Sequence, residues 1–367
     1  MELQLAREDL LKPLQQVIGA VERRQTMPAL GNVLLSAGEH GLQVTATDLE
    51  VELRATIELE VAREGETTVS ARKLLDICRN LPQGASLTLK QEGERVQVRS
   101  GRSRFTLATL PPGEFPLVDE LQGGVELALP QADLRRAIDR IAFAMAQQDV
   151  RYYLNGMLIE LGENRLRTVA TDGHRLSLSE TDANLPELQE QQVIVPRKGV
   201  HELVRLLEPE AEEPARIRLG ATHIQVSLPG LRFTSKLIDG RFPDYGRVVP
   251  EQGSNVLRAD REVLRQALAR ISILSNEKFK GVRLVMGDEG LRIQTNNPEQ
   301  EEAEEEVEVE YQGDPLEIGF NVVYLLDILA SLESDQVRIE FNDSNSSCLV
   351  TDGDSKQYRH VVMPMRL

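Results

Sequence analysis

Apolar residues along this chain alternate between a helical period and the period of extended strands. Residues spaced three and four apart form helical stripes, namely Leu10, Leu11, Leu14, Val17, Ile18 and Val21, then Leu134, Ile138, Ile141 and Met145, and finally Val263, Leu264, Ala267, Ile271 and Leu274. Second helices are predicted at 70–81, 196–207 and 321–332, with N-caps at Ser70 and Asn321 and Pro196 at a first helical position. Short alternating segments between these helices predict strands.

The same order of elements occurs three times. Related phrases end at Asp48, Asp172 and Asn297, and Leu42, Leu166 and Leu291 lie 124 and 125 residues apart. A period of about 125 residues is domain-sized, unlike the short periods of solenoids. We therefore predict three α+β domains of one fold, each with two helices and antiparallel sheets, over 1–123, 124–252 and 253–367. Gly- and Pro-containing stretches near 111–124 and 240–254 mark the boundaries.

Composition places the chain among globular proteins whose cores are mainly aliphatic. Hydrophobic residues make up 41%, charged residues 28% and aromatic residues 4%, and Trp is absent. No apolar run approaches the roughly 20 residues that span a bilayer, and residues 1–14 lack a signal-like core. Cys78 and Cys348 lie far apart in apolar surroundings, so we expect buried thiols in a reducing cytoplasm.

Charge is segregated between the two kinds of element. The net charge is −17, which by itself disfavours a nucleic-acid partner, yet the six predicted helical segments together carry +6. Good helix formers include Glu as well as Lys and Arg, so helix propensity alone does not explain the imbalance. If the helices share one face, that face is positive and suits a phosphate backbone without reading sequence. The chain has no sequence-reading motif such as a helix-turn-helix or a zinc finger.

Several longer phrases resemble one family from end to end. They include Gln148-Asp-Val-Arg-Tyr-Tyr-Leu-Asn-Gly156, Thr168-Val-Ala-Thr-Asp-Gly-His-Arg-Leu176, Val195-Pro-Arg-Lys-Gly199, Asp239-Gly-Arg-Phe-Pro-Asp-Tyr245, Ser275-Asn-Glu-Lys-Phe279, Asn296-Asn-Pro-Glu-Gln-Glu-Glu302 and Val361-Val-Met-Pro-Met-Arg-Leu367. The sequence resembles the bacterial sliding clamps, the β subunits of DNA polymerase III. The phrases span all three repeats.

The resemblance implies a head-to-tail homodimer in which two chains of three domains close a ring of six. Helices would line the hole and strands would form the outer wall, as the charge pattern independently suggests. Such a ring encircles duplex DNA without sequence specificity and makes the polymerase processive. The implied partners are the replicative polymerase catalytic subunit, clamp-loader subunits, other polymerases, mismatch-repair proteins and ligase, all through a shared cleft. No membrane partner, cofactor or metal is implied.

The family's DNA-contacting positions can be carried over residue by residue. They correspond to Arg24, Arg72, Gln148, Tyr152 and Tyr153, with the further inner-surface basic residues Arg197, Lys198 and Arg205. Arg and Lys would neutralise phosphates, while Gln and Tyr can bond to phosphate or stack on a base. The alternatives are a strand-edge core pair for the tyrosines and solvated surface charges for the basic residues.

The family's partner-peptide cleft lies between the second and third domains. The matching positions are Leu154, Thr171, Gly173, His174, Arg175, Leu176, Pro243, Arg247, Val248, Phe279, Asn321, Tyr324, Ser347, Val361, Val362, Met363, Pro364, Met365, Arg366 and Leu367. Chain ends are usually polar and frayed, so the apolar Met-Pro-Met-Arg-Leu ending is unusual. It could simply be the last strand of the third domain, but methionines repack easily and suit a groove with several partners.

Ring closure is expected to join the first domain of one chain to the third domain of the other. The residues expected there are Lys73, Arg102, Arg104, Phe105 and Leu107 on one side, and Ile273, Leu274, Glu299, Glu301 and Glu302 on the other. The glutamates complement the arginines, although an acidic run is more often a solvated surface. We expect the later glutamates of this run to be surface residues.

The residues alone leave two other function classes, an enzyme and a non-DNA scaffold. An enzyme could use Asp172 to orient His174 as a base, but the chain has no matching nucleophile, phosphate loop or metal-ligand cluster. Asp172 also occupies the slot of Asp48 and Asn297 in the other repeats, which indicates a turn residue. We therefore expect no catalytic residue. A non-DNA scaffold remains the alternative, separated from a clamp by loading onto closed circular DNA.

Overall fold

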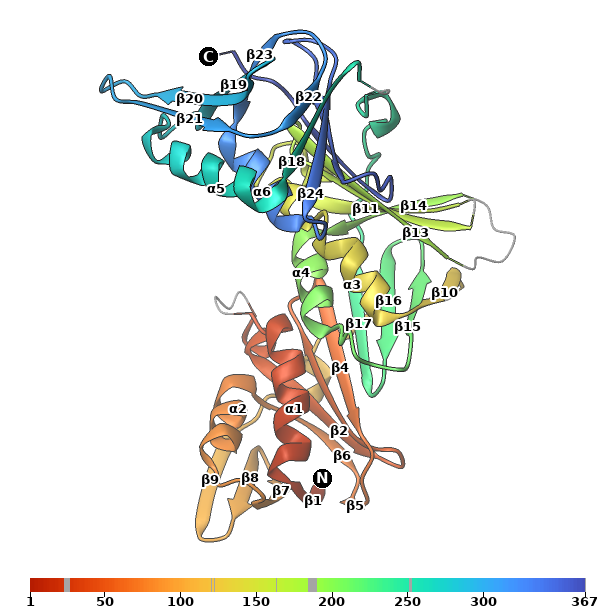
Figure 1. The fold of residues 1–367 in the computed structure, drawn as a ribbon. Coiled ribbons are helices and arrows are strands. Elements are labelled where there is room, and N and C mark those ends of the chain that lie inside the picture. Colours follow the sequence, from red (N-terminus) through yellow and green to blue (C-terminus); the bar gives the residue numbers. More distant parts are fainter. Residues whose placement is uncertain are drawn as a thin grey trace. The chain divides into compact units, whose positions relative to one another are not determined.

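The computed structural model describes residues 1–22, 27–119, 121, 123–162, 164–183, 190–250 and 253–366. Within these ranges one order of elements occurs three times (Figure 1). The first repeat contains β1 (Glu2–Ala6), α1 (Arg7–Val17), β2 (Asn32–Gly38), β3 (Gly41–Thr47), β4 (Val51–Ile57), β5 (Val61–Arg63), β6 (Gly65–Ser70), α2 (Ala71–Asn80), β7 (Ser86–Glu92), β8 (Arg95–Ser100) and β9 (Ser103–Ala108).

The second and third repeats follow the same plan. The second contains β10 (Val125–Leu129), α3 (Gln131–Asp139), β11 (Gly156–Gly162), β12 (Arg165–Thr171), β13 (Arg175–Asp182), β14 (Gln191–Pro196), α4 (Arg197–Leu206), β15 (Ala215–Leu219), β16 (His223–Leu228) and β17 (Leu231–Lys236). The third contains β18 (Asn255–Asp260), α5 (Arg261–Ile271), β19 (Gly281–Gly287), β20 (Gly290–Asn296), β21 (Glu302–Val307), β22 (Glu310–Gln312), β23 (Leu316–Asn321), α6 (Val322–Ser331), β24 (Gln336–Phe341), β25 (Cys348–Asp352) and β26 (Tyr358–Val362).

Two of the four sheets run from one repeat into the next. β17 pairs antiparallel with β4, which makes the eight-stranded sheet β10-β15-β16-β17-β4-β3-β2-β6. β26 pairs in the same way with β13, which makes the nine-stranded sheet β14-β11-β12-β13-β26-β25-β24-β18-β22. The other sheets, β5-β1-β7-β8-β9 and β21-β20-β19-β23, end at β9 and β21. These two strands are the counterparts of the strands that form the joints.

The joints explain how the chain divides into compact units. One unit contains Met1–Leu134 and Lys198–Leu237, and the other contains Arg135–Arg197 and Ile238–Leu367. The division cuts the second repeat because its two sheets each belong to a different neighbour. The domain boundaries expected from sequence, 1–123, 124–252 and 253–367, remain predictions.

The helices begin and end within a few residues of their predicted positions, but α1 ends at Val17 and α5 at Ile271, so Ile18, Val21 and Leu274 of the predicted stripes lie beyond them. Three other differences occur. α3 ends at Asp139, so Ile141 and Met145 of the predicted stripe lie beyond it, although both are buried. Val263 was predicted on the apolar stripe of α5 but is 51% exposed. Pro196 is the last residue of β14 and directly precedes α4, so it does not occupy the first helical position.

The predicted helix caps also divide. The Asn321 side chain accepts a hydrogen bond from the Val323 amide, as an N-cap should. Ser70 occupies the corresponding position before α2, but its side chain makes no capping hydrogen bond. Both predicted residues therefore stand at the N-cap position, and of the two Asn321 forms the capping hydrogen bond.

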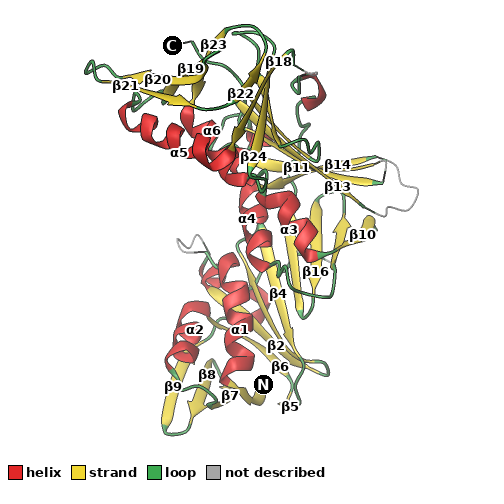
Figure 2. Cartoon of the chain, viewed as in Figure 1, coloured by secondary structure: helices red, strands yellow, loops and turns green. Residues whose placement is uncertain are grey.

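Each unit packs helices on one face of its sheets. In the first unit α1 and α2 lie side by side, and α1 packs on β3 and β4; in the second α5 and α6 lie side by side, and α5 packs on β20 and β21 (Figure 2). The cores are aliphatic, as the composition predicts, and Phe233, Phe320 and Phe341 are the largest side chains that are fully buried among the described residues.

Both cysteines are free and fully buried, as predicted. Burial raises the pKa of the Cys78 thiol to about 11 and that of Cys348 to about 12, so both stay protonated near neutral pH.

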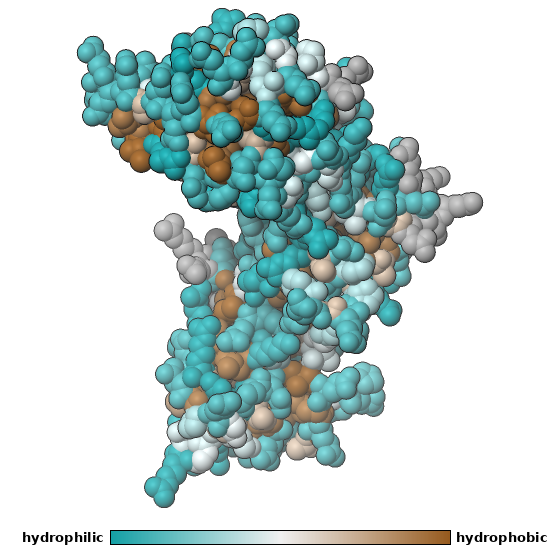
Figure 3. Space-filling model, in the orientation of Figure 1, coloured by the Kyte–Doolittle hydropathy of each residue, from teal (hydrophilic) through white to brown (hydrophobic). Residues whose placement is uncertain are grey.

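The visible face of the molecule is mostly hydrophilic, and apolar atoms gather where α5 and α6 lie in Figure 1 (Figure 3).

Candidate functional site

A cavity of 170 Å³ in the second unit lies where β13 and β26 join the second and third repeats. Ten predicted cleft residues line it: Leu154, Thr171, Gly173, His174, Arg175, Leu176, Pro243, Val248, Val361 and Met363. Four further lining residues, Arg151, Tyr153, Phe242 and Tyr245, were not expected in the cleft. We call this cavity the partner cleft.

The remaining predicted cleft residues lie around the cavity or apart from it. Phe279, Met365 and Arg366 line a separate cavity of 760 Å³ beside β19, β20 and β21. Val362 is fully buried, Arg247 is exposed, and Ser347 and Pro364 are partly buried. Asn321 caps α6 and Tyr324 lies within that helix, while Leu367 lies outside the described residues. The two cavities thus account for thirteen of the twenty predicted residues, while six others line neither cavity.

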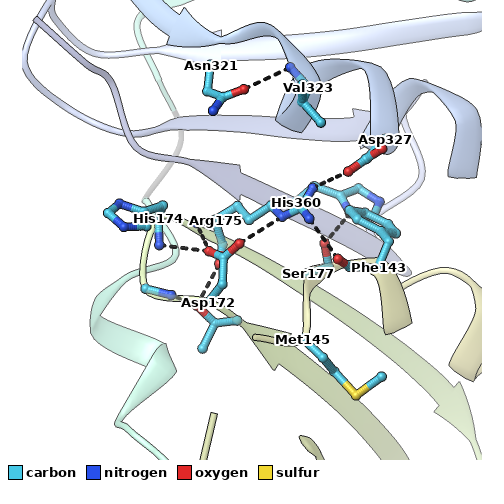
Figure 4. A network of polar contacts seen from close by, with 12 residues as sticks. Phe143, Met145, Asp172, His174, Arg175, Ser177, Asn321, Val323, Asp327 and His360 are labelled. Carbon is cyan, nitrogen blue, oxygen red and sulfur yellow. Dashed lines mark hydrogen bonds and ion pairs between the residues drawn. The ribbon is translucent and has the colours of Figure 1, made fainter. Parts of the chain in front are cut away.

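A tight turn at the mouth of the partner cleft is held by Asp172. Its Oδ1 accepts hydrogen bonds from the backbone amides of His174 (2.9 Å) and Arg175 (3.0 Å), and Gly173 has a φ of 88° that suits glycine (Figure 4). Asp48 makes the same pattern in the first repeat, where its Oδ1 accepts from Glu50 and Val51 amides. The turn interpretation of this position is therefore confirmed at both aspartates.

The turn geometry also bears on the enzyme alternative. The Asp172 carboxylate is used by backbone amides and by the Arg175 guanidinium, whose Nε lies 3.1 Å from Oδ2. Within the described part of the chain no hydrogen bond joins this carboxylate to the His174 imidazole, which is exposed. Asp172 thus shapes the loop, and the pair lacks the contact that a general base and its orienting group need.

Arg175 ties this turn to the third repeat. Its guanidinium donates to Asp327 of α6 (2.6 Å) and to the Phe143 carbonyl oxygen (2.8 Å), and it packs against the rings of Phe143 and Tyr324 (Figure 4). A guanidinium engaged this fully has little left to offer a ligand. Arg175 therefore fixes the wall of the partner cleft through its own contacts.

The predicted DNA-contacting tyrosines stand in an exposed turn. Tyr152 and Tyr153 lie in a 3₁₀ turn (Tyr152–Leu154) with ring centroids 5.7 Å apart, and Tyr152 is 58% exposed. Tyr153 is partly buried and packs against the cluster that includes Leu158 and Leu176, so the core alternative fails for Tyr152 and holds in part for Tyr153. Gln148 is exposed just before this turn, with a φ of 56°. The stretch has the exposed amide and aromatic groups that a nucleic acid backbone or base could contact.

The predicted basic residues differ in how far they are engaged within the chain. Arg72 is exposed and has no ion-pair or hydrogen-bond partner among the described residues. Lys198 contacts the Asp48 carboxylate, and Arg197 donates to the Met145 carbonyl oxygen at 3.0 Å. Arg205 donates to the Gln15 and Gln16 carbonyl oxygens at the end of α1. Arg24 lies outside the described residues.

The residues expected in ring closure lie on or beside β9 and β21, which we call the open strands because each has an unpaired edge in the described part of the chain. On β9 Phe105 is partly exposed and Leu107 is 8% exposed, with Arg102, Arg104 and, on α2, Lys73 exposed nearby. In the 3₁₀ turn Ser272–Leu274 that follows α5, Ile273 is 77% exposed and Leu274 is partly buried. Glu299, Glu301 and Glu302 are exposed at the start of β21. Of the later glutamates, expected to be surface residues, Glu305 forms an ion pair with Arg270.

No three or more His, Cys, Asp and Glu side chains in the described part of the chain gather in a way that could hold a metal ion. No described helix is long and apolar enough to cross a membrane.

Comparisons with known proteins cover the whole chain. Family models for the N-terminal, central and C-terminal domains of the DNA polymerase III beta subunit match residues 1–119, 128–244 and 246–366. Beta sliding clamps from Pseudomonas aeruginosa and Escherichia coli are 55% and 52% identical, each over 100% of both chains.

Solved structures agree with the sequence comparisons. The crystal structure of the DNA polymerase III subunit beta from Pseudomonas aeruginosa matches with a TM-score of 0.98 at 53% identity, over 100% of both chains. The corresponding protein from Caulobacter crescentus matches with a TM-score of 0.94 at 38% identity, also over 100% of both chains. A Pseudomonas aeruginosa sliding clamp bound to griselimycin matches over 100% of both chains with a TM-score of 0.96 at 54% identity.

Proposed function

The chain belongs to the family of DNA polymerase III beta subunits, the beta sliding clamps, and we propose that two copies join β9 to β21 to close a ring around duplex DNA. It is a sliding clamp of DNA replication. The proposed closure rests on one observation, which is that β17–β4 and β26–β13 are the same joint and that β9 and β21 are its two unused halves. Two chains related head to tail would each supply both halves.

The existing joints predict which residues meet across the proposed one. In the β3–β4 hairpin Thr47 pairs with Glu52, and in the β20–β21 hairpin Asn296 pairs with Glu302, so Glu52 and Glu302 are equivalent. Phe233 on β17 faces Leu53, the residue after Glu52. Because β9 carries the same Phe-Thr pair as β17, Phe105 corresponds to Phe233.

The transferred register brings opposite charges together. Phe105 of one chain would face Ala303 of the other, and Arg104 would face Glu304. Opposite charges directly across a strand pair are favourable, by roughly 0.2–1 kcal/mol. This register adds Glu304 to the acidic partners expected from sequence and supports a closed, head-to-tail dimer.

A charge exchange tests this register. Arg104→Glu and Glu304→Arg should each weaken the dimer, because each places like charges opposite one another, and the double variant should regain much of the loss. Sedimentation equilibrium measures the dissociation constant, with Glu308→Arg as a control because Glu308 is exposed just beyond β21. A double variant no better than the worse single variant would contradict the register.

The proposal for DNA is encirclement with weak, sequence-independent contacts. Such contacts are supported by the basic charge of the helical segments, by Arg72, which has no partner among the described residues, and by the exposed Tyr152. Protein loaded onto nicked circular DNA should be retained and should slide off once the circle is cut. Equal retention on circular and linear DNA would mean ordinary binding or a scaffold role.

Direct contact is tested separately from topology. Arg72→Ala with Gln148→Ala should weaken loading and direct DNA binding, because a phosphate partner and a polar contact are both lost. Both side chains are exposed, so the dimer should stay intact in sedimentation. Unchanged loading by this variant would mean that the DNA contacts lie elsewhere on the chain.

The partner cleft is proposed to bind short peptides of the polymerase, clamp-loader subunits and other replication and repair proteins. Its small volume of 170 Å³ and the buried apolar residues Leu176 and Val361 suit Leu and Phe anchors of a peptide that also carries a Gln. Ordering a flexible peptide offsets much of the burial energy, so micromolar affinity is expected. The related clamp solved with griselimycin supports a ligand site in this family.

One shared cleft implies competition between partners. Deleting 363–367 removes Met363 from the partner cleft and also Met365 and Arg366 from the neighbouring cavity. Polymerase and clamp-loader binding should then be lost together in a pull-down, while sedimentation still shows a dimer. A dimeric truncation that bound the polymerase normally would put the partner site elsewhere.

A further inference from the structure

A second cavity lies behind one wall of the partner cleft. It has a volume of 570 Å³, is mostly polar, and shares Phe242, Pro243 and Tyr245 with the partner cleft. The other lining residues come from β11, β12, β13, β14 and β26, so the cavity lies on the strands that carry the joint between the second and third repeats. We call it the rear cavity.

The carboxylates of the rear cavity have their acceptor capacity taken up. Glu160 accepts from Arg167 (2.8 Å), from the Tyr245 hydroxyl (3.0 Å) and from Gln192 (2.6 Å). Glu180 accepts from Arg167 at 2.7 Å and from Arg359 at 2.9 Å. Burial, and then the neighbouring Glu160, raise the pKa of Tyr245 to about 12, so its hydroxyl remains a donor. These groups have little left with which to bind a cation.

Donors, in contrast, are left over. The guanidinium of Arg241 lines the rear cavity, is exposed, and has no ion-pair or hydrogen-bond partner within the described ranges. The Nε of Arg359, another lining residue, also has no hydrogen-bond partner among the described residues, but this atom is fully buried, so Arg241 is the donor that a ligand in the cavity can reach.

The charges of the rear cavity lead to the same conclusion. The lining holds three carboxylates and three guanidiniums, so its formal charge is balanced. The carboxylates are all ion-paired, Glu160 with Arg167, Glu180 with Arg167 and Arg359, and Asp244 at 2.9 Å with Arg247, which does not line the cavity. Among the described residues Arg241 is the lining guanidinium without an ion-pair partner, so the charge that a ligand can engage here is positive.

We propose that the rear cavity binds a carboxylate, and that this carboxylate is an Asp or Glu side chain flanking the segment of a partner peptide that fills the partner cleft. The proposal rests on the proposed peptide-binding function. Phe242, Pro243 and Tyr245 line both cavities, so a peptide that leaves the cleft over these residues would pass the cavity that Arg241 lines. An acidic flanking residue would then add affinity and restrict which partners bind best.

The test uses the whole dimeric protein and one family of synthetic peptides. The parent peptide carries the Gln, Leu and Phe anchors, and matched versions extend either end with Ala residues plus a single Glu or a single Gln. Affinities are measured by fluorescence anisotropy for wild type, Arg241→Gln and Arg216→Gln. Arg216 is the control, since it is exposed on β15, lacks a partner among the described residues and changes the net charge equally.

A Glu extension at one end should bind wild type about fivefold more tightly than its Gln counterpart, the scale of about 1 kcal/mol for a partly exposed ion pair. Arg241→Gln should remove this difference, Arg216→Gln should keep it, and added salt should reduce it. No Glu preference at either end, or one that survives Arg241→Gln, overturns the proposal while leaving the partner cleft intact.

Two other results are also decisive. If the parent peptide does not bind at all, the partner cleft is wrong and this proposal falls with it. Inorganic phosphate is the probe for a free anion. If phosphate raises the melting temperature of wild type and not of Arg241→Gln, and Glu extensions have no effect, the rear cavity takes a free anion and the peptide carboxylate is excluded.

Discussion

Truncating the apolar residues of the 3₁₀ turn that follows α5 should convert the proposed ring into folded monomers. Ile273 is 77% exposed within one chain and Leu274 is partly buried. Alanine at these positions therefore removes little from the core of the monomer, while an interface that covers them would lose both side chains. Ile273→Ala with Leu274→Ala should fold normally, as judged by circular dichroism and the melting transition.

The size of the effect follows from the exposed area and from ring geometry. Burying an aliphatic side chain fully is worth about 1.5–3 kcal/mol, which gives about 2 kcal/mol for Ile273 and about 1 kcal/mol for the half-buried Leu274. A two-membered ring dissociates only when both interfaces open, so the losses double to about 6 kcal/mol. The dissociation constant should rise about ten-thousand-fold.

Sedimentation equilibrium across a concentration series measures this constant. Val263→Ala is the matched control, because Val263 is also an exposed aliphatic residue of α5, at 51% exposure, and is not expected at the interface. The control should sediment as wild type. A double variant whose dissociation constant stays within about tenfold of wild type would refute the placement of these residues in the interface.

Two further predictions concern stability. The buried His360, whose Nδ1 lies 2.9 Å from the Ser177 hydroxyl, has its pKa lowered to about 3, first by burial and then by Arg140. Between about pH 6.5 and about pH 3 His360 is protonated in the unfolded chain and neutral in the folded chain, so the free energy of unfolding should fall as pH drops through this range. The variant His360→Phe with Ser177→Ala should flatten the dependence of the melting temperature on pH. An unchanged slope would contradict this reasoning. Asn321→Ala should destabilise by about 1 kcal/mol in urea unfolding because the cap is lost, whereas Ser70→Ala should cost far less, and equal losses would contradict the cap assignment.

The repeat and its helices could be predicted from the sequence because both depend on local periodicity. Leu264, Ala267 and Ile271 are buried as their spacing requires, and the aliphatic cores follow from composition. Val263 was misplaced because it lies at the edge of the stripe, close to the start of α5, where one step around the helix separates buried from exposed. Local signals fix the period more securely than the width of the buried face.

Pairing between repeats could not be predicted in the same way. The residues of β17 do not specify β4 as the strand with which it pairs. Backbone hydrogen bonds are the same for every strand, so tertiary packing decides which strands are neighbours. The partner cleft has the same origin, because its walls come from segments far apart in the chain. The residues of the cleft could be predicted only through the family resemblance. Phe242 and Tyr245 were not predicted, although both lie in Asp239–Tyr245, one of the segments on which the resemblance rests.

The two open strands also decide which wrong assemblies the protein avoids. An unpaired strand edge can pair with any other unpaired edge. If the rotation between successive chains did not close a ring, repeated head-to-tail pairing would produce a filament. Here β9 carries Arg104, and β21 carries glutamates at most of its positions. Two β9 edges would bring arginines near one another and two β21 edges would stack carboxylates, so each edge repels its own kind. In the proposed closure, the charges thus distinguish the two joining strands, because β9 attracts β21 and neither strand attracts its own kind.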